Sequence, residues 1–329
     1  MNWGSMVTND VEDVVRYFFG SGYQLTELSS LAGGCISQAS RLSLTDPDGN
    51  CFTIFWKRND PDFLDNFQKE ADGLHRLALA GEVATPAVLA TGIVHGTSHF
   101  LTQWVETCPA KDGFFRKWGQ ALAKHHRATK GTRIGLEHDN YLGASTQTNR
   151  CPHEDWIDFV AQYRLIPQLE WANRAGLTNL TFKRQCQTII NELPTLLDGR
   201  EPCTSLLHGD LWSGNWLCGG LSTVPTNLFD KQHAPLIEVF EESAPDVPVW
   251  IDPAVYYGCR EAEFGMLLLF GGCPPEFYDA YQSEWPLPDG WQRRADVYVL
   301  YHLLNHLNLF GGGYRGSCET TAERLLRAI

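Results

Sequence analysis

Apolar and polar residues alternate with a period of two through much of the first hundred positions. Between Tyr23 and Trp56, two alternating runs separated by a Gly-Gly pair and a third run entered through DPDGN predict an antiparallel meander. A short helix is expected before it over Val11–Phe19, and helical spacing of apolar residues predicts a second helix over Asp62–Leu79. Two later apolar segments predict two more strands before residue 107.

Helical periodicity dominates beyond that point. The expected helices are Phe114–Ala128, Glu154–Arg174, Thr181–Leu197, Pro253–Phe270, Pro275–Ser283, Trp291–Leu309 and one at the C-terminus. Two short apolar runs, TSLLH and VPVWI, predict strands within this half, and the Pro-, Gly- and Thr-rich segment Gly219–Pro248 predicts a long surface insertion. We therefore expect an α+β chain of two lobes: a β-rich N-lobe at 1–106, a hinge near Gln103–Glu106, and an α-helical C-lobe at 107–329.

The acidic composition disfavours one class of function. A formal net charge of −13 over 329 residues disfavours broad nucleic-acid binding, which requires a basic surface. No apolar run approaches the ~20 residues of a membrane span, and the N-terminus lacks the basic and apolar regions of a signal peptide. Ten scattered cysteines without a CxxC pair are typical of free thiols, so a reducing, cytoplasmic location is expected.

A lysine and a glutamate form the first candidate for chemistry. Glu70 lies between Phe67 and Leu74 on the apolar face of the expected helix, where a buried carboxylate needs a cation. Lys57 ends the preceding apolar strand, CFTIFWK. A strand lysine facing a helix glutamate is the arrangement with which kinases hold ATP phosphates. The alternative is that Glu70 lies at the rim of the apolar face and reaches solvent.

The loop LAGGCISQA between two strands is the second candidate. Its glycines would let backbone N–H groups approach a phosphate closely. A plain hairpin turn is the alternative, because the loop does not match a GxGxxG pattern. Cys35 within it is either an ordinary small residue or a site of regulatory oxidation.

The stretch LLHGDLWSGNW is the third candidate. Asp210 can orient an attacking hydroxyl, Asn215 can bind Mg²⁺ through its amide oxygen, and His208 is expected to brace the loop. The spacing matches the H-x-D-x-x-x-x-N loop of kinases. The alternative, an HxD metal site of a hydrolase, lacks a further histidine cluster. Asp252 follows the strand VPVWI and is either a second metal carboxylate or the N-cap of a helix with Pro253 at its first position.

These features follow one another in the order found in kinases, and the chain resembles one kinase family over nearly its whole length. It is similar to the fructosamine kinases (ketosamine 3-kinases), relatives of aminoglycoside and choline kinases. The segments that carry the resemblance are the strand with Lys57, GGCISQASRL, FQKEADGLHRLALAG, HDNYLGASTQTN, LLHGDLWSGNW, IDPAVYYGCREAEFGMLLLFGG and YHLLNHLNLFGGGYRG. HGDLWSGNW followed by DPAVYYG is the most specific part.

The resemblance implies a bilobal, protein-kinase-like fold and a reaction. That reaction is ATP- and Mg²⁺-dependent phosphorylation of the sugar 3-hydroxyl of a ketosamine, either a free small molecule or part of a glycated protein. The 3-phosphate then eliminates and frees the amine, a deglycation repair.

The resemblance also implies roles for individual residues. Asp210 would be the catalytic base or orienter, and Asn215 and Asp252 the Mg²⁺ ligands. The nucleotide would be bound by Gly33, Gly34, Cys35, Ile36, Ser37, Lys57, Glu70, Gln103, Trp104, Val105 and Glu106. Substrate contacts are expected from His208, Trp212, Glu261 and Glu263, with surface charge on a helix as the alternative for the two glutamates.

Two departures from the family pattern stand out. The insertion Gly219–Pro248 lengthens the gap between Asn215 and Asp252, as a lid or as an inert loop. Trp56 and Arg58 flank Lys57 with larger side chains than the family usually has there. The competing functions are a kinase of the same fold for another hydroxylated amine, such as choline or an aminoglycoside, and an inactive nucleotide-binding module. Both a monomer and a homodimer are compatible with the sequence.

Overall fold

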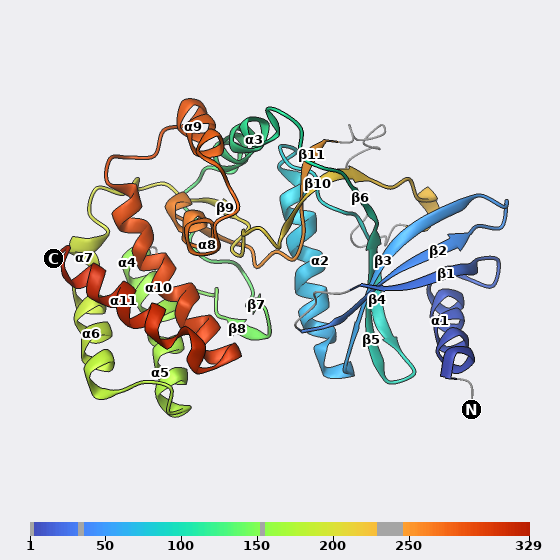
Figure 1. The fold of residues 1–329 in the computed structure, drawn as a ribbon, viewed down its shortest axis with the longest axis horizontal. Coiled ribbons are helices and arrows are strands. Elements are labelled where there is room, and N and C mark those ends of the chain that lie inside the picture. The colour runs from blue at the N-terminus through green and yellow to red at the C-terminus, as the bar shows by residue number, and fades with distance from the viewer. Residues whose placement is uncertain (1–2, 32–35, 152–154, 229–245) are drawn as a thin grey trace. The chain divides into compact units, whose positions relative to one another are not determined.

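The computed structural model describes residues 3–31, 36–151, 155–228 and 246–329 (Figure 1). It divides into two compact units. Unit 1 comprises 1–114 and 217–251, and unit 2 comprises 115–216 and 252–329. The chain therefore enters unit 2, returns to unit 1, and enters unit 2 again.

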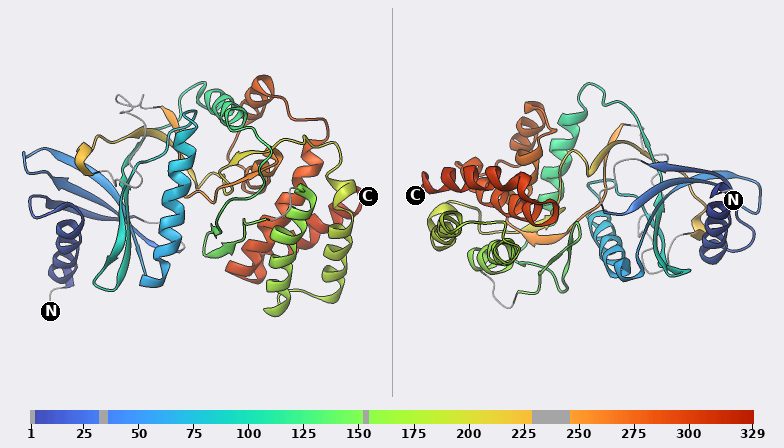
Figure 2. Two further views of the ribbon diagram at one scale, coloured as in Figure 1. Left: turned by 180° about the vertical axis from the view of Figure 1, so that it is seen from behind. Right: turned by 60° about the horizontal axis from the view of Figure 1, so that its bottom comes forward.

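Unit 1 is built on a five-stranded antiparallel sheet in the order β1-β2-β3-β5-β4. Its strands are β1 (Gln24–Leu31), β2 (Gln38–Thr45), β3 (Cys51–Asn59), β4 (Val88–Val94) and β5 (Thr97–Gln103). The predicted meander and the two strands after it are confirmed. Helices α1 (Trp3–Phe19) and α2 (Leu64–Leu79) cover opposite faces of the sheet (Figures 1 and 2). A 3-10 turn, Pro61–Phe63, precedes α2.

The period of two along β3 decides which side chain meets which helix. Trp56 is buried with Val11 and Val15 on the α1 face of the sheet. Lys57, the next residue, must point to the α2 face, where Phe100 is its partner across β5 and packs with Phe67. The bulk of Trp56 is therefore absorbed on the side of the sheet away from Lys57.

A second sheet explains why the chain returns to unit 1. Strand β10 (Trp216–Leu221) pairs with β6 (Val105–Thr107) on one side and with β11 (Val247–Trp250) on the other. The two ends of the predicted surface insertion are thus strands, and the boundary expected at residue 106 differs from the observed division. Val224 and Leu228 are also buried, in the core under α1. The turn-like composition of this segment concealed those few apolar positions.

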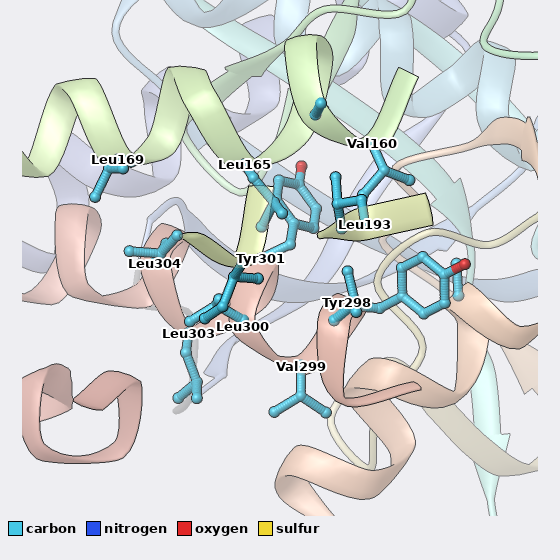
Figure 3. Close-up of a cluster of buried hydrophobic side chains, with 14 of the residues drawn as sticks. Val160, Leu165, Leu169, Leu193, Tyr298, Val299, Leu300, Tyr301, Leu303 and Leu304 are labelled. Carbon is cyan, nitrogen blue, oxygen red and sulfur yellow. The ribbon is translucent and has the colours of Figure 1, made fainter. Parts of the chain in front are cut away.

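Unit 2 is mainly helical. Its helices are α3 (Phe114–Ala128), α4 (Trp156–Val160), the π-helix Ala161–Leu165, α5 (Ile166–Arg174), α6 (Leu180–Asn191), α7 (Leu193–Leu196), α8 (Glu263–Phe270), α9 (Pro275–Glu284), α10 (Trp291–Phe310) and α11 (Arg315–Leu326). Short 3-10 turns at 260–262 and 312–314 precede α8 and α11. Helix α10 is central: Leu300 and Leu304 lie among side chains of α4, α5 and α7 (Figure 3). None of the helices in the described parts of the chain is long and apolar enough to span a membrane.

Two short strand pairs stand among these helices. Strand β9 (Ser205–Leu207) pairs with β12 (Tyr256–Gly258), and β7 (Asn140–Leu142) pairs with β8 (Ser145–Gln147). The prediction of a helix over Pro253–Phe270 is wrong in its first half, because that part of the chain contains β12, which pairs with β9. Asp252 is therefore not the N-cap of a helix.

Candidate active site

The lysine and glutamate predicted to pair do so within unit 1. Lys57 Nζ donates to Glu70 Oε1 at 2.8 Å, and both side chains are largely buried, with 11% and 12% exposed. Phe55 and Phe100 present their rings to the ammonium group at 5.9 and 5.8 Å. Glu70 is therefore held by a cation and does not reach solvent as the alternative reading required.

The Gly-rich turn is only partly described. Gly33, Gly34 and Cys35 lie outside the described residues, whereas Ile36 and Ser37 lie at the entry to β2. Asn59 at the end of β3 donates to the carbonyl of Ile36 at 3.1 Å and to Ser37 Oγ at 3.0 Å. This asparagine, which the sequence did not single out, ties the end of the turn to the strand that carries Lys57.

The four residues of the expected hinge have different surroundings. The Gln103 side chain bridges the residue before β4 and the residue after β10: it accepts from Ala87 N at 3.0 Å and donates to the Ser222 carbonyl at 3.0 Å. Trp104 donates to Ser222 Oγ and accepts from Ser222 N. Because bonded and non-bonded pairs alternate in an antiparallel ladder, the backbone groups of Val105 point away from β10, whereas those of Glu106 face Gly220.

The stretch LLHGDLWSGNW forms a tight loop after β9 in unit 2. Gly209 has φ +83°, and a Cβ there would lie 2.1 Å from the carbonyl oxygen of Ala254. Only glycine allows this approach, and Ala254 N donates to the His208 carbonyl at 2.8 Å. His208 is fully buried, and its Nδ1 accepts from Asp210 N at 3.3 Å. His208 thus braces the loop, as expected, and its burial does not support the further expectation of a substrate contact.

Asp210 and Asn215 are brought together by this loop. Asn215 Nδ2 donates to both the backbone carbonyl and Oδ2 of Asp210, at 2.9 Å each. Asn215 N also donates to the Trp212 carbonyl at 2.9 Å, which closes the turn. Since these bonds occupy the amide nitrogen, the amide oxygen is the atom left to act as a metal ligand.

Asp252 follows β11 in a left-handed conformation, φ +55°, which is uncommon for a residue other than glycine. The segment after it is held by buried amides of the β7–β8 pair. Asn140 Nδ2 donates to the Val255 carbonyl at 2.8 Å, and Gln147 Nε2 donates to the Ala254 carbonyl at 3.0 Å. These contacts give the motif HDNYLGASTQTN a physical role: it fixes the backbone beside Asp252.

Three carboxylates share this part of unit 2. Burial, the neighbouring charge of Asp252 and that of Glu263 raise the pKa of Asp210 well above its usual value, and the bond from Asn215 opposes the rise. Like charges gathered in a poorly hydrated place favour a bound cation. Two carboxylates and an amide oxygen are the hard donors that Mg²⁺ takes, so the residues present fit that ion.

Glu263, at the start of α8, anchors the loop backbone. It is 2% exposed; Oε2 accepts from His208 N at 2.6 Å and Oε1 accepts from Gly209 N at 3.1 Å. Burial raises the pKa of Glu263, and the two N–H bonds oppose that rise. The sequence identified this residue as a substrate contact or a surface charge; its burial excludes the surface charge, and its bonds give it a positioning role.

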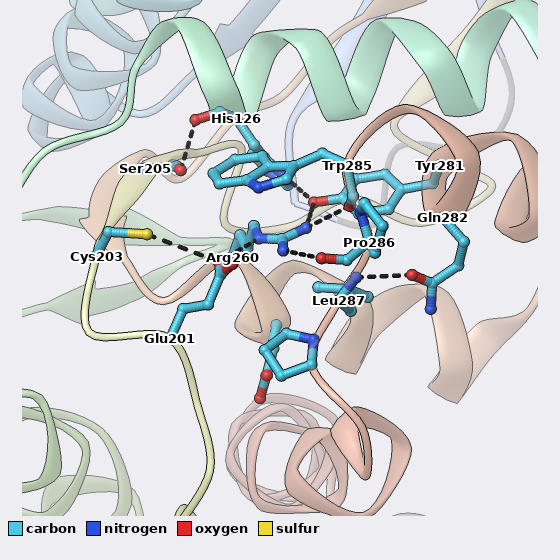
Figure 4. Close-up of polar contacts among 12 residues, drawn as sticks. His126, Glu201, Cys203, Ser205, Arg260, Tyr281, Gln282, Trp285, Pro286 and Leu287 are labelled. Atoms are coloured by element: carbon cyan, nitrogen blue, oxygen red, sulfur yellow. Dashed lines mark hydrogen bonds and ion pairs between the residues drawn. The ribbon is translucent and has the colours of Figure 1, made fainter.

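A chain of buried polar groups stands behind Glu263. Arg260 Nη1 donates to Tyr281 Oη at 3.0 Å, and Tyr281 Oη lies 2.9 Å from His126 Nδ1 (Figure 4). Burial holds the pKa of His126 well below its usual value, so the imidazole is neutral. Since the tyrosine oxygen accepts from Arg260, we assign the Tyr281 O–H as the donor to His126 Nδ1, which accepts. The remaining imidazole N–H, at Nε2, then faces Glu263 Oε2 at 3.6 Å.

The family model described as fructosamine kinase matches residues 7–328. The chain belongs to the fructosamine kinase family. A "probable ketoamine kinase" of Vibrio parahaemolyticus is 35% identical over 306 residues, which are 92% of this chain and 94% of that protein. The chloroplastic protein-ribulosamine 3-kinase of Arabidopsis thaliana is 33% identical over 325 residues, 97% of this chain and 89% of its own.

Solved structures agree with this family and with its fold. A protein of Thermobifida fusca provisionally named fructosamine-3-kinase superposes with TM-score 0.76 and 28% identity, covering 97% of this chain and 99% of its own. An aminoglycoside phosphotransferase, APH(4)-Ia, solved with ADP and hygromycin B, superposes with TM-score 0.59 and 14% identity over 97% of each chain. The second likeness concerns the fold alone and confirms the protein-kinase-like α+β architecture.

Two further residues predicted to contact substrate, Glu261 and Trp212, differ in exposure in this member of the fructosamine kinase family. Glu261 is 1% exposed, and both its oxygens accept from Arg294 at 2.7 Å. Because both carboxylate oxygens bind Arg294 in the protein interior, the structure does not support a substrate contact by Glu261. Trp212 is partly exposed and packs on Phe270, with ring centroids 5.4 Å apart, so it stays a candidate.

Proposed function

We propose that this protein is an ATP-dependent ketosamine 3-kinase. It would transfer the γ-phosphoryl group of Mg·ATP to the sugar 3-hydroxyl of a fructosamine or ribulosamine. The observation that carries the proposal is the arrangement of Asp210, Asn215 and Asp252 around the loop after β9, in a member of the fructosamine kinase family. Elimination from the 3-phosphate would release the amine, so the biological role would be deglycation of proteins or small amines.

The residues of unit 2 supply the chemistry at the hydroxyl. A carboxylate oxygen of Asp210 accepts the hydroxyl proton and aligns the attacking oxygen. Asn215 supports Asp210 through its amide nitrogen. Its amide oxygen and the carboxylate of Asp252 would hold the Mg²⁺. Bound Mg²⁺ supplies compensation for the negative charge on the phosphates.

The residues of unit 1 supply contacts to the nucleotide. The ammonium group of Lys57, held by Glu70, donates to phosphate oxygens. The described end of the Gly-rich turn, anchored by Asn59, directly precedes β2, the strand next to β3, and contributes backbone N–H groups. The backbone of Val105 is the best candidate to pair with adenine, because its N–H and C=O groups point away from β10 and take no part in the ladder to that strand.

The cellular location of the protein and the form of its substrate are part of the same proposal. The nine described cysteines are thiols and not disulfides, which supports a reducing, cytoplasmic setting. A partly exposed tryptophan in the catalytic loop, Trp212, could cover a sugar ring or the carbon chain of a glycated lysine.

A substrate panel tests the proposal. ATP consumption is measured with ribulose-lysine, fructose-lysine, choline and an aminoglycoside, and the position of the phosphate in the product is read by NMR. Turnover of a ketosamine with phosphate on the 3-oxygen supports the proposal. Turnover confined to choline or the aminoglycoside would instead favour the second candidate, a kinase of the same fold for another amine. Failure to bind Mg·ATP in calorimetry would favour an inactive binding module.

A further inference from the structure

Two cysteines and an aspartate converge in unit 1, and none of the three has a part in the proposed reaction. Cys108 directly follows β6, Cys218 lies in β10, and Asp246 directly precedes β11. The two sulfurs are 3.7 Å apart, and Cys218 Sγ lies 3.3 Å from Asp246 Oδ1. The three ligand atoms all lie within 4.8 Å of one another.

These separations match the edges of one coordination tetrahedron. Two sulfurs bound to a single Zn²⁺ at ~2.3 Å lie about 3.8 Å apart, and a sulfur and a carboxylate oxygen about 3.5 Å apart. The two observed distances differ from those values by only a few tenths of an ångström. Little movement is therefore required for all three atoms to bind one ion.

We propose that Cys108, Cys218 and Asp246 form a binding site for a thiophilic divalent cation of the zinc class, with water as the fourth ligand. Thiolates select soft or borderline metals, whereas the oxygen donors around Asp210 select Mg²⁺. Cys108 and Asp246 are partly exposed and Cys218 is 8% exposed, so an ion can reach the site from solvent. Binding releases the thiol protons, so the affinity rises with pH.

The position of the site gives the ion a structural effect. It would join the end of β6 to β10 and to the residue before β11, and so link all three strands of the smaller sheet. Val105, the proposed adenine contact, lies in β6, three residues before Cys108. Metal binding would therefore tie β6, which carries Val105, to both ends of the segment 217–251 that returns to unit 1.

Cobalt(II) provides the direct test, because thiolate–cobalt charge transfer and the intensity of its visible bands report sulfur ligands and tetrahedral geometry. The full-length protein is titrated with Co²⁺ and then Zn²⁺ in excess Mg²⁺, with a phosphine reductant present. We expect one equivalent of Co²⁺ with thiolate bands, its displacement by Zn²⁺, and a rise in the thermal midpoint. Cys108→Ser and Cys218→Ser should each weaken Zn²⁺ binding by at least about 100-fold, more than the loss of an outer-shell partner costs.

Two further variants keep the test decisive. Asp246→Asn retains the shape of the side chain and should weaken binding while the protein folds normally. Cys203→Ser is the matched control, because Cys203 also lies against a carboxylate, 3.6 Å from Glu201 Oε2, but in unit 2 and outside the proposed site. Absence of thiolate bands in the unmodified protein, or bands that persist in both Cys108→Ser and Cys218→Ser, would overturn the proposal.

Discussion

Replacing Glu263 should separate loop positioning from folding. Its two oxygens accept from His208 N and Gly209 N, and both of these residues are buried. Leaving a buried donor unsatisfied costs about 1–3 kcal/mol. Glu263→Ala orphans two donors, so we expect a loss of about 2–6 kcal/mol in the free energy of unfolding. Glu263→Gln keeps one acceptor but turns an NH₂ group toward an N–H, so about 1–3 kcal/mol is expected.

The effect on catalysis should exceed what unfolding explains. Gly209 immediately precedes Asp210, so a loop released from Glu263 moves the catalytic carboxylate. A displacement near 1 Å can cost roughly 10²-fold in rate. Under conditions where Glu263→Gln is folded, kcat should fall by about 10- to 100-fold while KM for ATP changes little.

Glu261→Gln is the matched control for this experiment. It lies two residues away and is equally buried, but both its oxygens bind Arg294 and neither contacts the loop. We expect lower stability from denaturant unfolding but nearly unchanged kcat per folded molecule. The positioning argument fails if Glu263→Gln and Glu261→Gln lose kcat equally, or if Glu263→Gln keeps full turnover.

Three other predictions concern single residues. Lys57→Met removes a charge-assisted bond to phosphate worth about 1.5–3 kcal/mol, so calorimetry should show the Kd for ATP rising roughly 10- to 150-fold; an unchanged Kd would count against the phosphate contact. Asp252→Ala should raise the Mg²⁺ concentration needed for ATP binding, and an unaltered Mg²⁺ requirement would contradict its role as a ligand. Burial lowers the pKa of His302 to about 3. Between pH 6.5 and pH 3 this imidazole is therefore protonated in the unfolded chain but not in the folded protein, so the free energy of unfolding falls as the pH falls. His302→Leu should remove about 1.4 kcal/mol per pH unit from that loss in unfolding measured from pH 6 to pH 4, and parallel pH profiles of the two proteins would refute the assignment.

The parts of the site that follow strand and helix periodicity were predictable. Lys57 alternates with the apolar residues of β3, and Glu70 shares a helix face with Phe67, so local spacing alone brings the two charges to one side. The kinase-like spacing of Asp210 and Asn215 lies within one loop, where short-range hydrogen bonds close the turn.

The errors arose where distant segments decide local structure. Pro253 after Asp252 is typical of a helix start, but pairing of β12 with β9 imposes a strand instead. The spacing of Glu261 and Glu263 could not show which buried partner each carboxylate meets, since Arg294 and the backbone of His208 are remote in sequence. For the same reason β10, at the start of the long insertion, was not predicted, because its partner β6 is about 110 residues earlier.

Single-turnover transfer by Asp210→Asn tests the central claim most directly. The variant keeps the shape of the side chain and an amide that Asn215 can still meet, but it loses the basic oxygen. With a ketosamine that the unmodified enzyme phosphorylates, we expect Mg·ATP to bind with near-normal Kd and the transfer rate to fall by about 10²–10⁴-fold. A transfer rate within a few-fold of that of the unmodified enzyme would contradict the assignment of Asp210 as the catalytic group.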